Sequence, residues 1–103
     1  MALIRIDTLK CIRKKDFSGE DEPEICIAGL SVWSGKMGKG DSRSPAVERS
    51  FTDSVLVELK EQNNNSTTSL GKWTVNDTPT ANGNAPLTAT SSGYHYEMYY
   101  DVE

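Results

Sequence analysis

Residues 3–27 of the chain, LIRIDTLKCIRKKDFSGEDEPEICI, decide the fold of this protein. The stretch contains two apolar runs, residues 3–12 and 25–27, with a polar segment between them. That segment holds several acidic side chains together with Gly19 and Pro23, and glycine and proline both favour turns. Two apolar runs on either side of such a segment predict two β-strands joined by an acidic connection.

The first apolar run changes its phase partway along. Ile4 and Ile6 alternate with polar residues, as in a half-buried strand, but the next apolar residues in the pattern are Leu9 and Ile12. A shift of this kind is typical of a β-bulge or a strong twist. We therefore expect a strand over residues 3–12 with an irregularity near its middle.

Later segments show the same alternation of apolar and polar residues. The expected strands are residues 31–33, 49–60, 70–75 and 94–103. In residues 49–60, Phe51, Val55 and Val57 share one parity, and Asp53 is the exception. The last strand is expected to place on one face Tyr94, Tyr96, Met98, Tyr100 and Val102, and on the other His95, Glu97, Tyr99 and Asp101.

The chain between these strands is polar. Residues 34–46, 62–69 and 76–93 are rich in glycine, serine, lysine, threonine and asparagine, which predicts exposed connections, the last with room for one weak edge strand. No window has helical periodicity. The sequence therefore predicts an all-β fold, a small antiparallel β-sandwich of about seven to eight strands, in a single domain over residues 1–103.

The charge of the chain argues against nucleic acid as its partner. The 103 residues carry a net charge of -4, whereas phosphate binding needs a basic surface. No stretch has the roughly 20 apolar residues that span a bilayer, and the first residues lack the apolar segment of a signal peptide. We expect a protein that is cytoplasmic, secreted without a classical signal peptide, or missing its leader.

Cys11 and Cys26 are the only cysteines, too few for a disulfide framework. An antiparallel hairpin centred on residues 18–19 would bring them roughly opposite each other and permit a disulfide. Two buried free thiols are the favoured prediction, because nothing in the sequence directs the chain to an oxidising compartment.

The acidic connection is the first candidate for a binding site. Its carboxylates belong to Asp16, Glu20, Asp21, Glu22 and Glu24. Hard cations such as calcium prefer ligands of this oxygen-rich kind. The alternative is a solvated acidic turn that is partly neutralised by Arg13, Lys14 and Lys15.

The order of these features resembles the C-two domains, the calcium- and lipid-binding β-sandwich modules. The pattern Leu3-x-x-Ile6-x-x-Leu9-x-x-Ile12, followed by Asp16-x-x-Gly19-x-x-Glu22-Pro23, is similar to the first strand and first calcium loop of that family. The pattern Val55-x-Val57-x-x-x-Glu61-x-Asn63, followed by Leu70-Gly71, is similar to the strand that enters the third calcium loop and to the pair that leaves it.

The resemblance implies calcium as the cofactor and a set of metal ligands. These would be Asp16, Asp21, Glu22, Glu61 and Asn63. The aspartates of the family's third loop correspond in this chain to Glu61, Asn63 and about Thr67, which are longer, uncharged or weak ligands. Because calcium affinity depends on the number and rigidity of the carboxylates, the metal site is degraded and weak binding or none is expected.

We therefore expect a non-enzymatic binding module that resembles a calcium-dependent membrane-binding domain, with an anionic membrane surface as its partner. The basic group Lys36, Lys39, Arg43 and Arg49 could meet that surface, although a solvated loop is the favoured interpretation. An enzyme is not expected, because His95 is the only histidine and no base–nucleophile pair is evident.

Two alternatives remain open. One is a calcium-independent protein-interaction module, such as a small leaderless effector or a toxin component. The other is a carbohydrate-binding module, which requires Trp33 or Trp73 to lie exposed and flat on one surface. Aromatic side chains on strands are more often part of the core.

Overall fold

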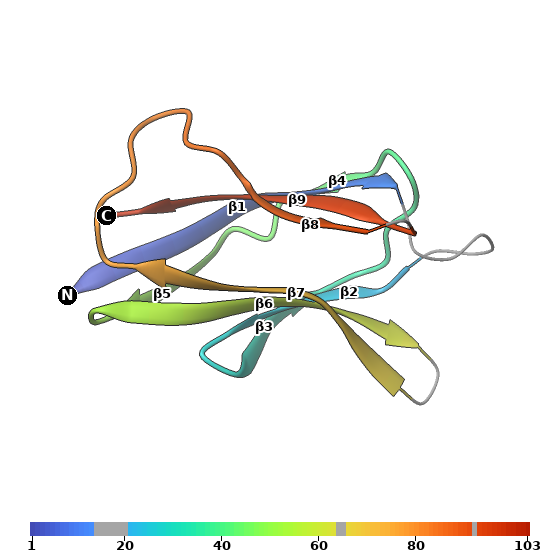
Figure 1. Cartoon of the computed structure of the whole chain (residues 1–103), viewed down its shortest axis with the longest axis horizontal. Helices are drawn as coiled ribbons and strands as arrows, with labels where there is room; N and C mark the ends of the chain where they lie inside the picture. The colour runs from blue at the N-terminus through green and yellow to red at the C-terminus, as the bar shows by residue number, and fades with distance from the viewer. Residues whose placement is uncertain (14–20, 64–65, 92) are drawn as a thin grey trace.

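The computed structural model describes residues 1–13, 21–63, 66–91 and 93–103, which form strands and connections (Figure 1). The strands are β1 (Ala2–Arg13), β2 (Pro23–Ile27), β3 (Leu30–Ser34), β4 (Ser42–Arg43), β5 (Val47–Phe51), β6 (Ser54–Asn63), β7 (Ser66–Asn76), β8 (Leu87–Thr90) and β9 (His95–Val102). Within these described ranges there is no helix, and so none that is long and apolar enough to cross a membrane.

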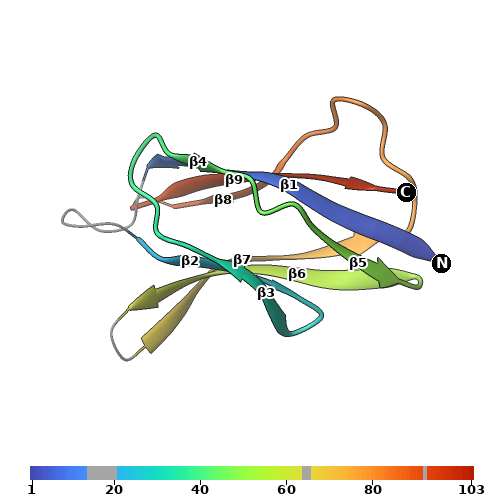
Figure 2. The same cartoon turned by 180° about the vertical axis from the view of Figure 1, so that it is seen from behind.

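The strands form two antiparallel sheets that lie face to face (Figure 2). The first sheet has the order β4–β1–β9–β8. β5 and β4 both pair with the same edge of β1, β5 with its first half and β4 with its second half. The second sheet has the order β3–β2–β6–β7. The expected all-β antiparallel sandwich is confirmed, with nine strands among the described residues.

The irregularity expected in β1 is confirmed. Ile4, Ile6 and Leu9 are fully buried, and the register with β9 shifts between Ile6 and Thr8. The extra residue is Asp7, which is exposed. A bulge at this position keeps the apolar side chains of both halves of the strand in the core.

The two cysteines lie in different sheets. Cys11 is on β1 and Cys26 on β2, so the hairpin that would have placed them opposite each other does not form. Neither cysteine forms a disulfide and both are buried, as predicted. Cys11 takes the inward position that the sequence pattern assigned to Ile12, and Ile12 is 41 % exposed.

The single strand expected over residues 49–60 is wrong. The chain forms β5 in the first sheet and β6 in the second, and Thr52 and Asp53 connect them. Asp53 has φ of 68°, a left-handed conformation that turns the chain from one sheet to the other. Phe51 and Val55 both point inward because the core lies between the sheets, so the alternation continues in the sequence although the strand does not.

Three polar segments contain more structure than expected. Residues 62–69 were predicted to be a connection, but β6 extends to Asn63 and β7 begins at Ser66. In residues 34–46 the structure adds the short strand β4 and places Met37 fully in the core. The weak edge strand expected in residues 76–93 is confirmed as β8.

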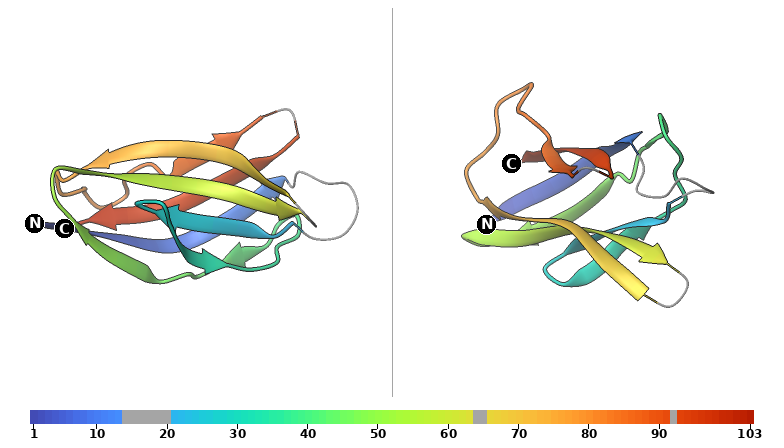
Figure 3. Two further views of the ribbon diagram at one scale, coloured as in Figure 1. Left: turned by 90° about the horizontal axis from the view of Figure 1, so that it is seen from below. Right: turned by 45° about the vertical axis from the view of Figure 1, so that its right-hand side comes forward.

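The core lies between the two sheets, which Figure 3 shows from two further directions. Two half-buried tryptophans, Trp33 and Trp73, pack against it. Trp33 of β3 lies over Gly35, where a Cβ would come within 2.9 Å of the indole ring. Trp73 of β7 lies over Gly71, where the corresponding distance is 2.8 Å, with Ala89 of β8 next to it. Only glycine leaves room for either ring, because Cβ atoms do not approach so closely.

Candidate functional site

One end of the sandwich brings together the two segments that the sequence predicted as calcium loops. β1 ends and β2 begins there, and β6 is followed by β7 at the same end (Figure 1). Pro23 of β2 is opposite Glu61 of β6, and the Gln62 N–H donates to the Glu22 carbonyl at 3.0 Å. We call this the loop end. Its backbone hydrogen bonds hold residues 21–23 beside the last residues of β6.

Asp21 is fixed inside the loop end by hydrogen bonds of both its backbone and its side chain. Its N–H donates to the Met37 carbonyl at 2.9 Å, and its own carbonyl accepts from the Met37 N–H at 2.8 Å. The side chain is fully buried, and its carboxylate accepts a 2.6 Å hydrogen bond from the hydroxyl of Tyr96. Asp21 therefore joins the segment before β2 to the first sheet through the interior.

Tyr96 keeps its proton in this environment. Burial, and then the hydrogen bond to Asp21, raise the pKa of the Tyr96 hydroxyl well above its ordinary value. The residue lies on β9 opposite Cys11 of β1 and is fully buried. Tyr96 is thus a permanent donor to the Asp21 carboxylate.

Glu61 is the second acidic side chain that is fully buried at this end. It follows Leu59 on the inward face of β6 and lies opposite Pro23. Burying a carboxylate is costly unless hydrogen bonds, ion pairs or a metal compensate for the lost hydration. Among the described residues, the two fully buried acids are Asp21 and Glu61, and they lie on the two predicted calcium segments.

The other acidic and amide residues predicted to bind calcium are not buried in the same way as Asp21 and Glu61, or lie partly or wholly outside the described residues. Glu22 is half-buried. Asn63 is the last residue of β6. Asp16 and Glu20 lie outside the described residues. Glu24 lies on β2, where a hydrogen bond from Ser31 lowers the pKa of its carboxyl group, so this acid is already engaged within the second sheet.

Within the described ranges, no three histidine, cysteine or acidic side chains are grouped closely enough to hold a metal ion. At the loop end the structure holds two buried acids, Asp21 and Glu61, and the Tyr96 hydroxyl, which donates to Asp21. The oxygen chemistry of these groups suits a hard cation. Calcium as a cofactor stays a prediction.

Sequence reasoning missed the role of the Tyr96 hydroxyl. The alternation of β9 placed Tyr96 correctly on the inward face, and Met98 and Val102 are buried beside it as predicted. A buried tyrosine usually needs a hydrogen-bond partner, so an inward tyrosine in a chain with an acidic connection was the available signal.

The tryptophans and Tyr94, all within the described ranges, do not form a flat exposed platform. Trp33 and Trp73 are half-buried and pack against the core. Tyr94 is also half-buried, and its hydroxyl donates to the Leu70 carbonyl at 2.9 Å. Tyr99 is on the outer face of the first sheet, as its parity predicted, where Lys10 lies 5.1 Å from its ring centroid.

His95 is half-buried on that same outer face, and its Nε2 is 3.6 Å from Glu97. Of the basic residues between 36 and 49, Arg43 is engaged locally, since it donates to the Lys36 carbonyl at 2.9 Å and lies 3.5 Å from Asp41. Arg49 is exposed on β5, away from that loop. These positions are compatible with a solvated surface.

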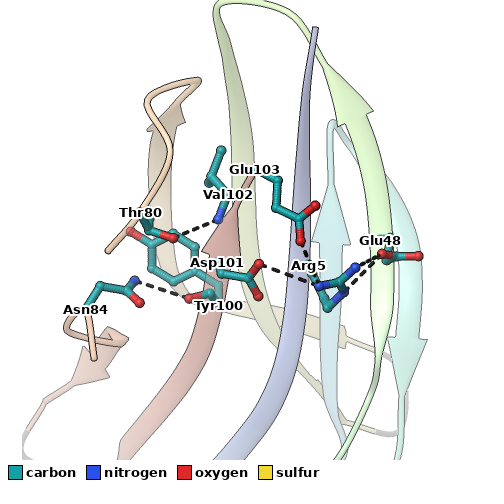
Figure 4. A network of polar contacts seen from close by, with 8 residues as sticks. All are labelled: Arg5, Glu48, Thr80, Asn84, Tyr100, Asp101, Val102 and Glu103. Carbon is teal, nitrogen blue, oxygen red and sulfur yellow. Dashed lines mark hydrogen bonds and ion pairs between the residues drawn. The ribbon is translucent and has the colours of Figure 1, made fainter. Parts of the chain in front are cut away.

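The opposite end of the sandwich carries a network of exposed charges (Figure 4). Arg5 donates to Glu48 from Nε at 3.0 Å, to Glu103 at 3.2 Å, and lies 3.7 Å from Asp101. Burial and then the neighbouring Asp7 carboxyl raise the pKa of Asp101, and together they outweigh the lowering effect of Arg5.

Beside this network the connection between β7 and β8 is attached to β9. The Val102 N–H donates to the Thr80 hydroxyl at 2.9 Å, and the Asn84 side chain donates to the Tyr100 carbonyl at 3.2 Å (Figure 4). A depression of about 550 Å³ lies along the attached segment, next to Asp101. The Thr80 and Asn84 side chains thus hydrogen-bond to the backbone of β9 at Val102 and Tyr100, past the residues of β9 that pair with β8.

No known protein family matches this chain, and no curated protein matches its sequence.

Proposed function

We propose that this chain is a non-enzymatic, C-two-like binding module whose loop end binds calcium and, through it, an anionic membrane surface. The order of the acidic and apolar patterns in the sequence supports the family resemblance. The two antiparallel sheets are compatible with it. The loops that would face the membrane follow β1 and β6, which end on the same side of the molecule.

One observation carries the proposal: Asp21 and Glu61 are both fully buried, and they lie on the two segments that the resemblance assigns to calcium. Carboxylate oxygens are the ligands that calcium prefers, and these two acids belong to different segments that meet at the loop end. Calcium, when bound, would supply positive charge between these acids and lipid phosphate. The Tyr96 hydroxyl orients the Asp21 carboxylate and keeps it from rotating away.

Thermal unfolding in excess calcium against excess chelator tests the proposal. A ligand at about a hundred times its dissociation constant stabilises the native state by about 2.7 kcal/mol, so a rise in melting temperature is expected with calcium. Asp21→Asn and Glu61→Gln should each abolish the difference between calcium and chelator. Using that difference within each variant removes the effect of the substitution on stability itself.

Asp77→Asn is the matched control, because Asp77 is an exposed acid just beyond the far end of β7. It should keep the full response to calcium. The absence of any calcium response in the native chain would contradict the proposal and leave the calcium-independent protein-interaction module as the better hypothesis. If calcium does bind, sedimentation with phosphatidylserine vesicles should follow the same pattern across the three variants.

A further inference from the structure

β7 has the longest edge without a neighbouring strand in the described part of the chain. It has 11 residues and is the last strand of the second sheet. The other edge strands, β3, β4, β5 and β8, have five residues or fewer. An unpaired edge presents a row of N–H and C=O groups that can pair with another strand.

The hydrogen bonds at the end of β7 show which of its backbone groups face outward. The Asp77 N–H donates to the Asp53 carbonyl at 3.0 Å, so the backbone of residue 77 faces β6. Hydrogen-bonding groups alternate between the two sides of a strand. Residues 75 and 73 therefore also face β6, and the backbone groups of Lys72, Thr74 and Asn76 point away from the sheet.

No described residue hydrogen-bonds with the outward backbone groups of Lys72 or Thr74. Earlier on the same edge, the Leu70 carbonyl is not available, because it accepts a hydrogen bond from the Tyr94 hydroxyl. The open stretch thus begins after the bulge in the β6–β7 ladder and continues to Asn76.

A groove of about 440 Å³ lies directly beside this open stretch. Its apolar walls are Trp73 and Val75 from β7, and Leu87, Tyr100 and Val102 from the first sheet. The groove therefore lies between β7 and the first sheet, and one of its walls is the open edge itself.

We propose that the edge of β7 from Lys72 to Asn76 binds an extended peptide segment of a partner protein, which adds to the second sheet as a further strand. Backbone hydrogen bonds to an edge strand supply affinity in this mode of recognition, and pockets for alternate side chains supply specificity. Both parts are present in this molecule. The proposal is independent of calcium, because Asn76 lies at the end of β7 remote from the loop end (Figure 1).

The structure specifies the chemistry of the peptide. In an antiparallel added strand, the residues opposite Trp73 and Val75 point into the groove and should be apolar. The residue opposite Thr74 faces solvent. The Lys72 side chain is 61 % exposed and its ammonium lies 3.9 Å from Glu58 of β6. The residue opposite Lys72 should be acidic, because an opposite charge directly across a strand pair is favourable and can share this exposed cation with Glu58.

A second copy of this chain fits the edge less well. In a β7–β7 pairing, the inward side chains of the added strand would be Trp73 and Val75 of the second copy, and these already pack within their own sandwich. They could not also fill the groove. A free peptide brings side chains that have no other partner.

The experiment is a nuclear magnetic resonance titration of isotope-labelled protein with the blocked peptide Thr-Ile-Thr-Ile-Glu. Saturable shifts are expected at the amides of Lys72, Thr74 and Asn76 and at Leu87 and Tyr100 along the groove. The matched peptide is N-methylated on its central threonine, which removes the N–H that would donate to Thr74. It should bind at least about tenfold more weakly, since it loses a hydrogen bond and gains a steric clash.

Thr74→Pro tests the same bond from the protein side. Proline is tolerated on an edge strand where the lost N–H faces outward, and the variant should weaken peptide binding about tenfold or more. Thr74→Ala retains the N–H and should bind within about twofold of the native chain.

Three results would overturn the proposal. The first is no shift along residues 72–76 up to the solubility limit of the peptide. The second is equal binding of the methylated and unmethylated peptides, a comparison made on the native protein and so independent of how the variants fold. The third is a dimer in sedimentation that Thr74→Pro abolishes, which would assign the edge to a second copy.

Discussion

The two ends of the sandwich hold charged residues in opposite ways. At the loop end, Asp21 and Glu61 are fully buried, and Tyr96 donates to Asp21 from the interior. At the other end, the acids around Arg5 stay on the outer face of the first sheet, where the side chains of Arg5 and Glu48 are 36 % and 46 % exposed.

Charged residues of the same types therefore contribute very different amounts to the free energy of unfolding at the two ends. An exposed ion pair competes with water and contributes between zero and about 1 kcal/mol. A buried carboxylate that loses a hydrogen-bond donor bears the cost of its own desolvation. Position between the sheets, more than the number of charges, decides which contacts the fold depends on.

Tyr96→Phe should have the largest effect on this comparison. It removes the buried hydroxyl that donates to Asp21, and a hydrogen bond to a charged group contributes about 2 kcal/mol. We expect the free energy of unfolding in urea to fall by about that amount, with an unchanged slope.

Tyr99→Phe is its control. Tyr99 also donates its hydroxyl to a carboxylate, that of Glu97 at 2.9 Å, but on the exposed face of the same strand. This variant should leave the free energy of unfolding almost unchanged. Equal losses in the two variants would show that burial does not separate the two ends of the molecule.

Arg5→Gln should have a smaller effect. The substitution removes the cation shared by Glu48, Asp101 and Glu103, so some stability should be lost at low ionic strength. Because screening weakens exposed pairs, the difference from the native chain should vanish in about 1 M salt. The loss in Tyr96→Phe should persist at that concentration, and urea unfolding at both ionic strengths checks the contrast.

The smallest expected effect is a pH dependence from Asp101. Its folded-state pKa is raised by burial and by Asp7, so the folded chain holds this proton more tightly than the unfolded chain does. The resulting stabilisation is complete below the unfolded pKa of about 3.9 and is lost as the pH rises through the folded pKa.

The free energy of unfolding of the native chain relative to Asp101→Asn should therefore decrease as the pH rises across that interval. A difference that stays constant with pH, or increases, would contradict the prediction. Asp7→Asn should reduce the slope, since Asp7 is the acidic neighbour that helps to raise the pKa of Asp101.

Much of the fold could be predicted because alternation is a local property of strands. The phase change near Asp7, the inward face of β9 and the weak strand β8 were all visible in the sequence. The division of residues 49–60 was not visible. Phe51 and Val55 are both inward residues of the same parity, and the only local sign of the turn was a polar residue, Asp53, at an apolar position.

The candidate site was less predictable than the fold. The sequence identified the acidic side chains, but the inward placement of Asp21 depends on Met37 and Tyr96, residues 16 and 75 positions away. The Met37 contact was missed because the flanking glycine, serine and lysine residues indicate an exposed loop.

By itself, the sequence determined that the chain forms strands and which side chains face a common core, because those properties follow from a period of two residues. Only the tertiary structure decided which strands share a sheet, because pairing depends on contacts between distant segments. It also decided that Asp21 and Glu61 lie inside the loop end and that the edge of β7 stays open. Both follow from how the two sheets pack against each other, which no local pattern encodes.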